Sequence, residues 1–168
     1  MIIIEHLRLP LVLLTAIGCA LTAGIFFAFS TFVMQALALQ PSSPGIAVMQ
    51  SINITVINPW FMAVFFGPGI AGAILTVFAL RHWDQPGMAY WVAGSLLYII
   101  GTLGVTIVGN IPLNDALAIV SPNSVEGTAL WTTYLTDWTL WNHIRTGAAA
   151  VSAALFTLSL CTQSSLPT

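Results

Sequence analysis

Long apolar stretches dominate this chain and leave it few ways to fold. Only three of its 168 residues are basic and five are acidic, and the mean hydropathy is +0.95. About 25% of residues are charged in a typical soluble domain, against 5% here, which is too little charge for a water-exposed surface. Four stretches, at about 11–39, 60–80, 88–108 and 142–161, are long and apolar enough to cross a bilayer, which takes about 20 residues.

These stretches predict an all-α integral membrane protein, a four-helix bundle that forms a single membrane domain over residues 1–168. Polar breaks flank two further segments, near 45–57 and 124–140, which we expect to be short extramembrane helices on the same side of the bundle. The second of them can continue directly into the fourth span. Pro112 disfavours a helical conformation for the residue before it, so we expect the chain to turn there.

The basic residues predict an orientation. Arg8 and Arg81 fall on the same side of a four-span bundle, and the positive-inside rule makes that side cytoplasmic. Both termini then face the cytoplasm, and the membrane is the plasma membrane if the protein is bacterial. Arg145 lies near the opposite end of the fourth span, against this rule, which points to a function or a partner for its charge. The net charge of −2 argues against nucleic acid, which requires a clustered basic surface.

Polar and aromatic residues concentrate in residues 110–145. If a helix continues from residue 124 into the fourth span, the rotation of about 100° per residue places Trp138, Asn142 and Arg145 on one stripe. Trp131 lies on the same stripe and Trp141 flanks it. His143 faces another direction, because it lies only two residues from Arg145.

Each of these residues also has a structural interpretation. The tryptophans can form an interfacial belt, Arg145 can snorkel or pair with Asp115, and His143 can be a lone interfacial histidine. The asparagines at 58, 110 and 114 can cap helices. The alternative for the whole set is a site for a flat, apolar molecule that carries an oxygen.

Under that alternative, we predict a cavity between the spans at their outward end. Its expected lining is Phe27, Thr31, Asn58, Asn114, Trp138, Asn142 and Arg145. Phe27 and Thr31 are four residues apart and so share a face of the first span. Asn110, Trp131 and Trp141 complete the candidate substrate-binding residues.

Several motifs resemble the DUF1772, or anthrone oxygenase-like, family of small integral membrane proteins. They are AGIFFAFSTFVMQAL in the first span, VINP before the second, NIPLNDAL after the third and WNHIRT in the fourth. The resemblance implies a membrane-embedded monooxygenase that converts a tricyclic anthrone, or a related phenolic lipophile, to a quinone with O₂ and without a metal or organic cofactor. It also implies that Asn114, Asn142 and Arg145 occupy the most characteristic polar positions of the family.

The chemistry suggests roles for the polar residues. An anthrone has an acidic CH₂ opposite its carbonyl, and its enolate can pass an electron to O₂. Arg145 and Asn142 suit the oxyanion, and Asp115 or His143 is the candidate base. The three histidines are far apart in sequence, so no metal site is predicted.

Two alternatives remain open at this stage. One is a haem protein with His143 as axial ligand. The other is a non-catalytic binder or transporter of small lipophilic molecules. Contacts with membrane lipid follow from the composition, and homo-oligomerisation is left open.

Overall fold

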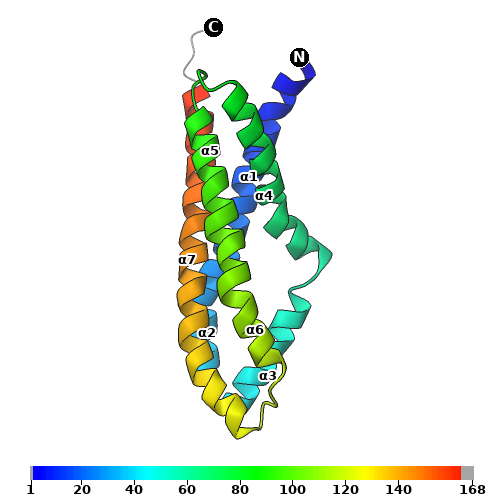
Figure 1. Cartoon of the computed structure of the whole chain (residues 1–168), viewed down its shortest axis with the longest axis vertical. Helices are drawn as coiled ribbons and strands as arrows, with labels where there is room; N and C mark the ends of the chain where they lie inside the picture. Colours follow the sequence, from blue (N-terminus) through cyan, green and yellow to red (C-terminus); the bar gives the residue numbers. More distant parts are fainter. Residues whose placement is uncertain (1, 164–168) are drawn as a thin grey trace.

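The chain forms four helical columns joined by short connections (Figure 1). This description rests on a computed structural model, which describes residues 2–163 and the side chains of residues 8–162. The first column comprises α1 (Ile2–Ala28), the π-helical turn η1 (Phe29–Val33) and α2 (Met34–Ala38), and the second is α4 (Pro59–Arg81). The third comprises α5 (Met88–Leu96), the π-helical segments η2 (Leu97–Gly104) and η3 (Thr106–Asn110), and α6 (Ile111–Ala118), and the fourth is α7 (Val125–Gln163). Four helices are long and apolar enough to cross a membrane, which confirms the predicted all-α four-helix membrane bundle.

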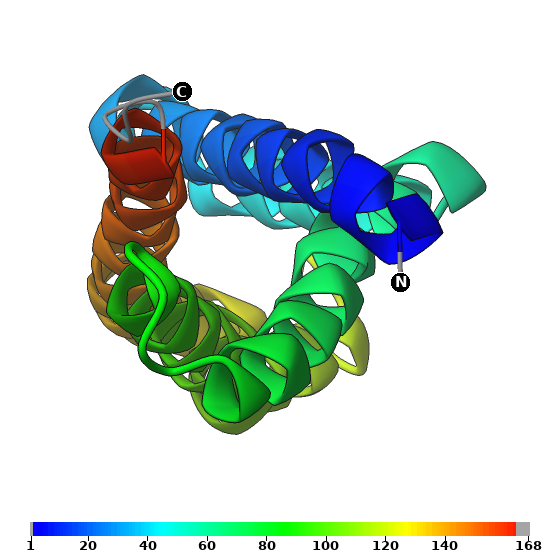
Figure 2. The same cartoon turned by 90° about the horizontal axis from the view of Figure 1, so that it is seen from above.

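The columns form a closed ring when they are viewed along the bundle (Figure 2). α1 packs against α4 and α7, and α5 packs against the same two helices on the other side. The beginning of α1 and the end of α7 lie at one end of the molecule, whereas α6 and α3 (Ser42–Thr55) lie at the other end (Figure 1).

One column is shorter than the others, and α3 completes it. α4 has 23 residues, about 35 Å at 1.5 Å per residue, which matches the ~30 Å hydrocarbon core of a bilayer. α7 has 39 residues and extends well beyond that. Where α4 is missing, α3 packs against α2, α6 and α7. The second column is therefore divided between two helices, with a junction at residues 56–58.

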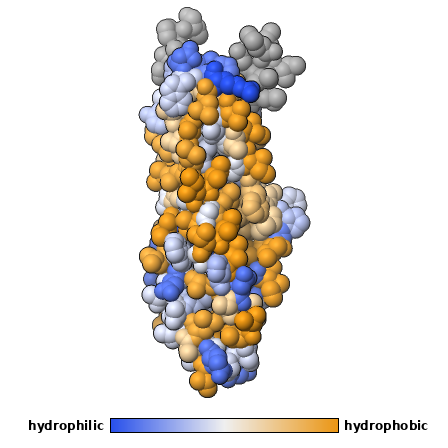
Figure 3. All heavy atoms as spheres, viewed as in Figure 1, coloured by the Kyte–Doolittle hydropathy of each residue, from blue (hydrophilic) through white to orange (hydrophobic). Residues whose placement is uncertain are grey.

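The exposed face of α7 changes character along its length. Near α3 it presents threonines and the exposed acidic residues Glu126 and Asp137. From Ile144 onward it presents Val151, Leu158 and small apolar residues. In Figure 3 the middle of the molecule is mainly orange, and blue and white patches are mixed with orange in the half that contains α3, with further blue residues at the opposite end. The change near residue 143 divides α7 into a part with a mainly polar exposed face and a part with a mainly apolar one.

The two expected extramembrane segments lie at the same end of the bundle, as predicted. The segment near 45–57 is α3, and the segment near 124–140 is the first part of α7, continuous with the fourth span. The expected turn at Pro112 is wrong, because the helix continues to Ala118. Helix α6 starts at Ile111, directly after η3, so Pro112 lies in its first turn, where a missing N–H costs little.

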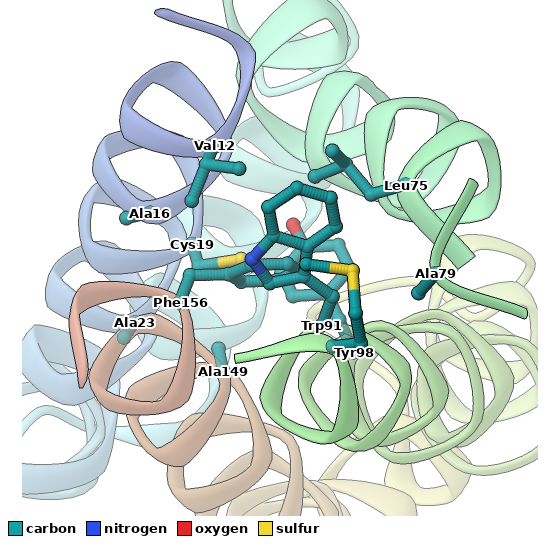
Figure 4. Packing of buried hydrophobic residues seen from close by; sticks show 11 residues of the cluster. Val12, Ala16, Cys19, Ala23, Leu75, Ala79, Trp91, Tyr98, Ala149 and Phe156 are labelled. Carbon is teal, nitrogen blue, oxygen red and sulfur yellow. The ribbon is translucent and has the colours of Figure 1, made fainter. Parts of the chain in front are cut away.

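Two buried clusters hold the bundle together. The cluster in the α4 half is centred on Trp91, Tyr98 and Phe156 (Figure 4). The indole of Trp91 donates to Ser159 Oγ at 2.9 Å, and the hydroxyl of Tyr98 donates to the carbonyl of Phe65 at 2.8 Å. The cluster in the α3 half contains Met34, Leu37, Ile46, Met49, Leu117, Trp131, Tyr134 and Trp138. The candidate site lies between the two clusters.

Candidate functional site

A cavity of about 250 Å³ opens at the junction of α3 and α4. Small-molecule pockets usually measure about 300–1,000 Å³ and are mainly apolar with a few placed polar groups. The polar part of this lining is Asn53, Thr106, Asn114 and Arg145. The rest is Ile25, Phe26, Phe29, Met49, Ile52, Val56, Ile57, Phe61, Met62, Phe65, Phe66, Ile111 and Trp138. Its size and apolar walls suit a small, flat lipophilic ligand.

Two of the π-helical turns lie at the level of the cavity. Phe29 belongs to η1 and Thr106 belongs to η3, and both side chains line the cavity. A π-turn widens a helix locally and occurs frequently at functional sites. Here the two turns shift the register of the first and third columns where each one faces the cavity.

Among the residues that the structure describes, Arg145 is the only charged one that lines this cavity, and it is 6% exposed. Its Nε donates to Asn142 Oδ1 at 3.0 Å and its Nη1 donates to Thr106 Oγ1 at 3.3 Å. Its Cζ lies 3.9 Å from the ring centroid of Phe26 and 5.0 Å from that of Trp138. Nη2 has no hydrogen-bond partner among the described residues. The guanidinium is therefore held between two aromatic faces with one donor group left for a ligand.

No carboxylate neutralises this cation in the part of the chain that the structure describes. Its hydrogen-bond partners are an amide and a hydroxyl, and the acidic Asp115 and Asp137 are both exposed. The alternative in which Arg145 pairs with Asp115 is therefore wrong. A buried charge is costly unless it is paired, so this geometry favours an anionic or strongly polar oxygen on the ligand.

Asn142 lies behind Arg145 and positions it. It is fully buried and does not line the cavity. Its Nδ2 donates to the carbonyl of Phe26 and to Ser30 Oγ, both at 2.7 Å, while its Oδ1 accepts from Arg145. Both N–H groups are thus used within the protein. Contrary to the expectation that it holds the substrate oxyanion, Asn142 has no N–H group left for a ligand, and it accepts a hydrogen bond from Arg145 instead.

Asn114 lines the cavity on the other side of Trp138. Its Oδ1 accepts from the hydroxyl of Tyr134 and from the indole Nε1 of Trp138, both at 2.8 Å. Tyr134 in turn lies 3.5 Å from the amide nitrogen of Asn53. The rings of Trp131, Tyr134 and Trp138 stack in succession along α7, with centroids 5.5 and 6.1 Å apart. This aromatic stack fixes the orientation of the Asn114 amide.

Phe27 and Thr31 do not line the cavity, contrary to expectation. They do share a face of the first column, but Phe27 is 59% exposed and Thr31 is exposed and donates to the carbonyl of Phe27. Phe26 and Phe29 lie at the cavity instead. Phenylalanines occupy both faces of this segment, and a lipid-facing surface is as apolar as the interior, so hydrophobicity could not identify the inner face.

Four other candidates have structural contacts instead of a place in the lining. Asn58 caps α4 by accepting from the amide of Phe61 at 3.1 Å. Asn110 is buried and donates to the carbonyl of Trp138 at 3.1 Å. The indoles of Trp131 and Trp141 pack against the backbone at Gly45 and Gly109, respectively.

The two candidate bases lie outside the cavity. Asp115 and His143 are exposed and do not contribute to the lining. His143 points away from Arg145, as its spacing indicated, so it cannot be the axial ligand of a haem in this cavity. Among the described residues no group of three or more histidine, cysteine or acidic side chains is arranged to hold a metal ion.

Thr106 lines the cavity but was not among the residues predicted for the site. Thr106, Asn110 and Asn114 are spaced four residues apart, which places them along one face of a continuous helix. The expected turn at Pro112 separated Asn114 from the other two. Asn53 was not predicted at the site either, because nothing local indicates that α3 lies below α4.

Comparison with known proteins identifies a family. No curated protein and no solved structure matches the chain significantly. The family described as anthrone oxygenase matches residues 60–155, which include α4, the third column and most of α7. The matched region contains Asn114, Asn142 and Arg145, and the chain belongs to the anthrone oxygenase family.

Proposed function

We propose that this protein is a membrane-embedded oxygenase that uses O₂ to oxidise an anthrone-like polycyclic or phenolic lipophile. The observation that carries the proposal is Arg145, a buried cation without a carboxylate partner that faces an aromatic, apolar cavity. A flat substrate fits between such walls, and its oxygen supplies the negative charge that the site lacks. Membership of the anthrone oxygenase family supports the same reaction class.

The reaction converts anthrone and O₂ to anthraquinone and water. The CH₂ opposite the carbonyl loses a proton, and the electron pair of that C–H bond delocalises onto the carbonyl oxygen as an enolate. The enolate transfers one electron to O₂, and the resulting radical and superoxide combine at the ring carbon. After protonation, the hydroperoxide loses water to form the second carbonyl. Each step needs only the substrate, O₂ and protons.

Arg145 contributes by stabilising the enolate. A hydrogen bond from a charged donor is worth about 1.5–3 kcal/mol, and it favours the enolate because the negative charge appears on the bound oxygen. Asn142 and Thr106 hold the guanidinium in place before the substrate arrives, so little reorganisation accompanies the charge. Since neither Asp115 nor His143 reaches the cavity, we assign proton removal to a water molecule inside it.

The proposed orientation places the cavity toward the outer surface. Arg8 and Arg81 lie at the end of the bundle that contains both described termini of the helical chain. Under the positive-inside rule this end is cytoplasmic, so α3 and the cavity lie at the external boundary of the membrane.

The test is oxygen uptake by the purified protein in lipid nanodiscs supplied with anthrone. We expect uptake and anthraquinone formation in equal amounts, above the spontaneous oxidation measured with empty nanodiscs. Arg145→Met should lower the rate toward that background, whereas His143→Ala, at an exposed position two residues away, should keep it. A parent rate equal to the background would refute the oxygenase proposal.

One observation favours a second candidate, a non-catalytic binding protein for lipophilic phenols. Apart from Arg145, the lining contains no titratable side chain, so the protein itself offers no proton acceptor at the substrate. Binding of anthraquinone that depends on Arg145, without oxygen uptake from anthrone, would support this alternative.

A further inference from the structure

Asn114 lines the cavity, and two hydrogen bonds hold its amide in a fixed orientation. An amide oxygen has two lone pairs, and Tyr134 and Trp138 occupy both at 2.8 Å. Rotating the amide by 180° would place its NH₂ group against two donors. The Nδ2 atom therefore keeps its position, and it has no hydrogen-bond partner among the described residues.

The direction of the Tyr134 proton is set by a third residue. The amide nitrogen of Asn53 is a donor only, and it lies 3.5 Å from the hydroxyl of Tyr134. The hydroxyl accepts from Asn53 and so turns its own proton toward Asn114. Asn53, Tyr134 and Asn114 thus form a chain with a single polarity that ends at the cavity, where Asn114 can donate but has no lone pair to offer.

Two donors flank the same indole ring. The guanidinium of Arg145 lies over the face of Trp138, 5.0 Å from its centroid, and Asn114 binds the nitrogen at the edge of that ring. Both residues line the cavity together with mainly apolar side chains. A ligand that satisfies both donors must carry two acceptor oxygens, and the aromatic side chains of the lining favour a flat ring system between them.

We infer that the cavity is a quinone site, in which Arg145 binds one oxygen of a flat aromatic ligand and the Asn114 amide binds a second acceptor oxygen. This inference rests on the proposed function for the first contact and extends it with the second. It makes Asn114 a specificity-determining residue that distinguishes ligands with two acceptors from ligands with one. An anthraquinone has one carbonyl more than its anthrone precursor, so the site should hold its product more firmly than its substrate.

The test compares two unreactive ligands in nanodiscs containing the full chain. 9,10-Anthraquinone has two carbonyls on opposite edges of a tricyclic system, and 9-fluorenone has one. Bound ligand is separated from free ligand and quantified, and the amount retained by empty nanodiscs is subtracted. We expect the parent to bind anthraquinone about tenfold more tightly than fluorenone, the contribution of about one hydrogen bond.

The informative variant is Asn114→Asp. A carboxylate oxygen still accepts from Tyr134 and Trp138, but the NH₂ donor is gone, so a merely structural role would survive. We expect the anthraquinone preference to fall to about one, with weaker binding of both ligands, because the new carboxylate partly neutralises the cation that binds the first oxygen. Asn114→Ala should remove the preference as well, and thermal unfolding of each variant reports whether the aromatic stack remains folded.

The outcomes separate this inference from the proposed function. A parent without a preference for anthraquinone, or a folded Asn114→Asp variant that keeps the preference, overturns the quinone site. Arg145→Met should weaken both ligands by a similar factor. If it weakens neither, the oxyanion contact of the proposed function fails, although a preference that depends on Asn114 would still establish the second contact.

Discussion

Replacing Arg145 with methionine distinguishes an arginine kept for ligand binding from one kept for stability. Methionine has a similar length and no charge. The change removes the hydrogen bonds to Asn142 and Thr106 and the contacts with two aromatic faces. Thr106 remains hydrogen-bonded, since its hydroxyl also donates to the carbonyl of Thr102 at 2.7 Å. Only the Oδ1 atom of Asn142 loses its partner.

The losses and the gains for folding are of similar size. An unsatisfied buried acceptor costs about 1–3 kcal/mol, and a desolvated cation–π contact is worth about 2 kcal/mol. Against this, an arginine is unfavourable by about 2.5–3.5 kcal/mol at the centre of a membrane helix, and by less near the boundary where Arg145 lies. The free energy of unfolding should therefore fall by about 2 kcal/mol, or a few degrees in Tm for a chain of this size. Ligand affinity should fall about 10- to 100-fold, the value of one charged hydrogen bond.

The assay measures both quantities on the same nanodisc sample. Thermal unfolding is followed by circular dichroism, and the dissociation constant for anthraquinone is measured by retention. The matched control is Arg8→Met, because Arg8 also lies over an indole, 5.9 Å from the centroid of Trp91, and donates to Gln85 at 3.0 Å, but it does not line the cavity. A large loss of Tm in Arg145→Met, combined with unchanged affinity, would show that the arginine is structural and would refute the reasoning.

Further predictions use matched pairs of residues. Phe26→Leu should weaken ligand binding about tenfold, because the Phe26 ring, 3.9 Å from the guanidinium carbon, helps to hold the buried arginine in place. Phe27→Leu changes a position that is 59% exposed and should leave the dissociation constant unchanged. His143→Ala should keep oxygen uptake within about twofold of the parent, and a loss as large as that in the arginine variant would restore the histidine as the base. Gly109→Ala should destabilise the bundle by about 1–3 kcal/mol, because a Cβ there would lie 2.5 Å from an indole. Gly147→Ala, where a Cβ meets nothing within 4 Å, should leave Tm equal or slightly higher in the same unfolding measurement.

The fold could be predicted largely because a bilayer restricts the choices. Apolar stretches of sufficient length must be helices in a membrane, since every backbone group needs an internal partner. The turn expected at Pro112 was wrong because the preference of residues before proline is statistical, and η3 ends just where Ile111 begins a new first turn. The stacking of α3 below α4 depends on contacts with α2, α6 and α7, which no local pattern specifies.

The site was predictable where helical periodicity determined the geometry. The spacing on α7 separated Arg145 from His143, and the structure has the first buried and the second exposed. Periodicity shows which side chains share a face of the helix, but not which of them reaches the cavity. Asn142 was therefore expected at the substrate, although it lies behind Arg145. In the first column, where the faces are equally apolar, the same reasoning identified a shared face for Phe27 but assigned it to the wrong side.

The mouth of the cavity determines the phase from which a ligand arrives. Ile25, Ile57 and Phe66 line the cavity and are also 37%, 71% and 45% exposed on the outer surface, near the junction of α3 and α4. A ligand that passes this mouth comes from the surrounding lipid. The concentration that determines binding is therefore the mole fraction of ligand in the lipid, not its concentration in the whole solution. Adding lipid at constant total ligand should then lower occupancy by surface dilution, and a KM in bulk molarity would increase in proportion to the lipid present. The protein therefore binds a hydrophobic compound from the bilayer, where that compound is more concentrated than in water.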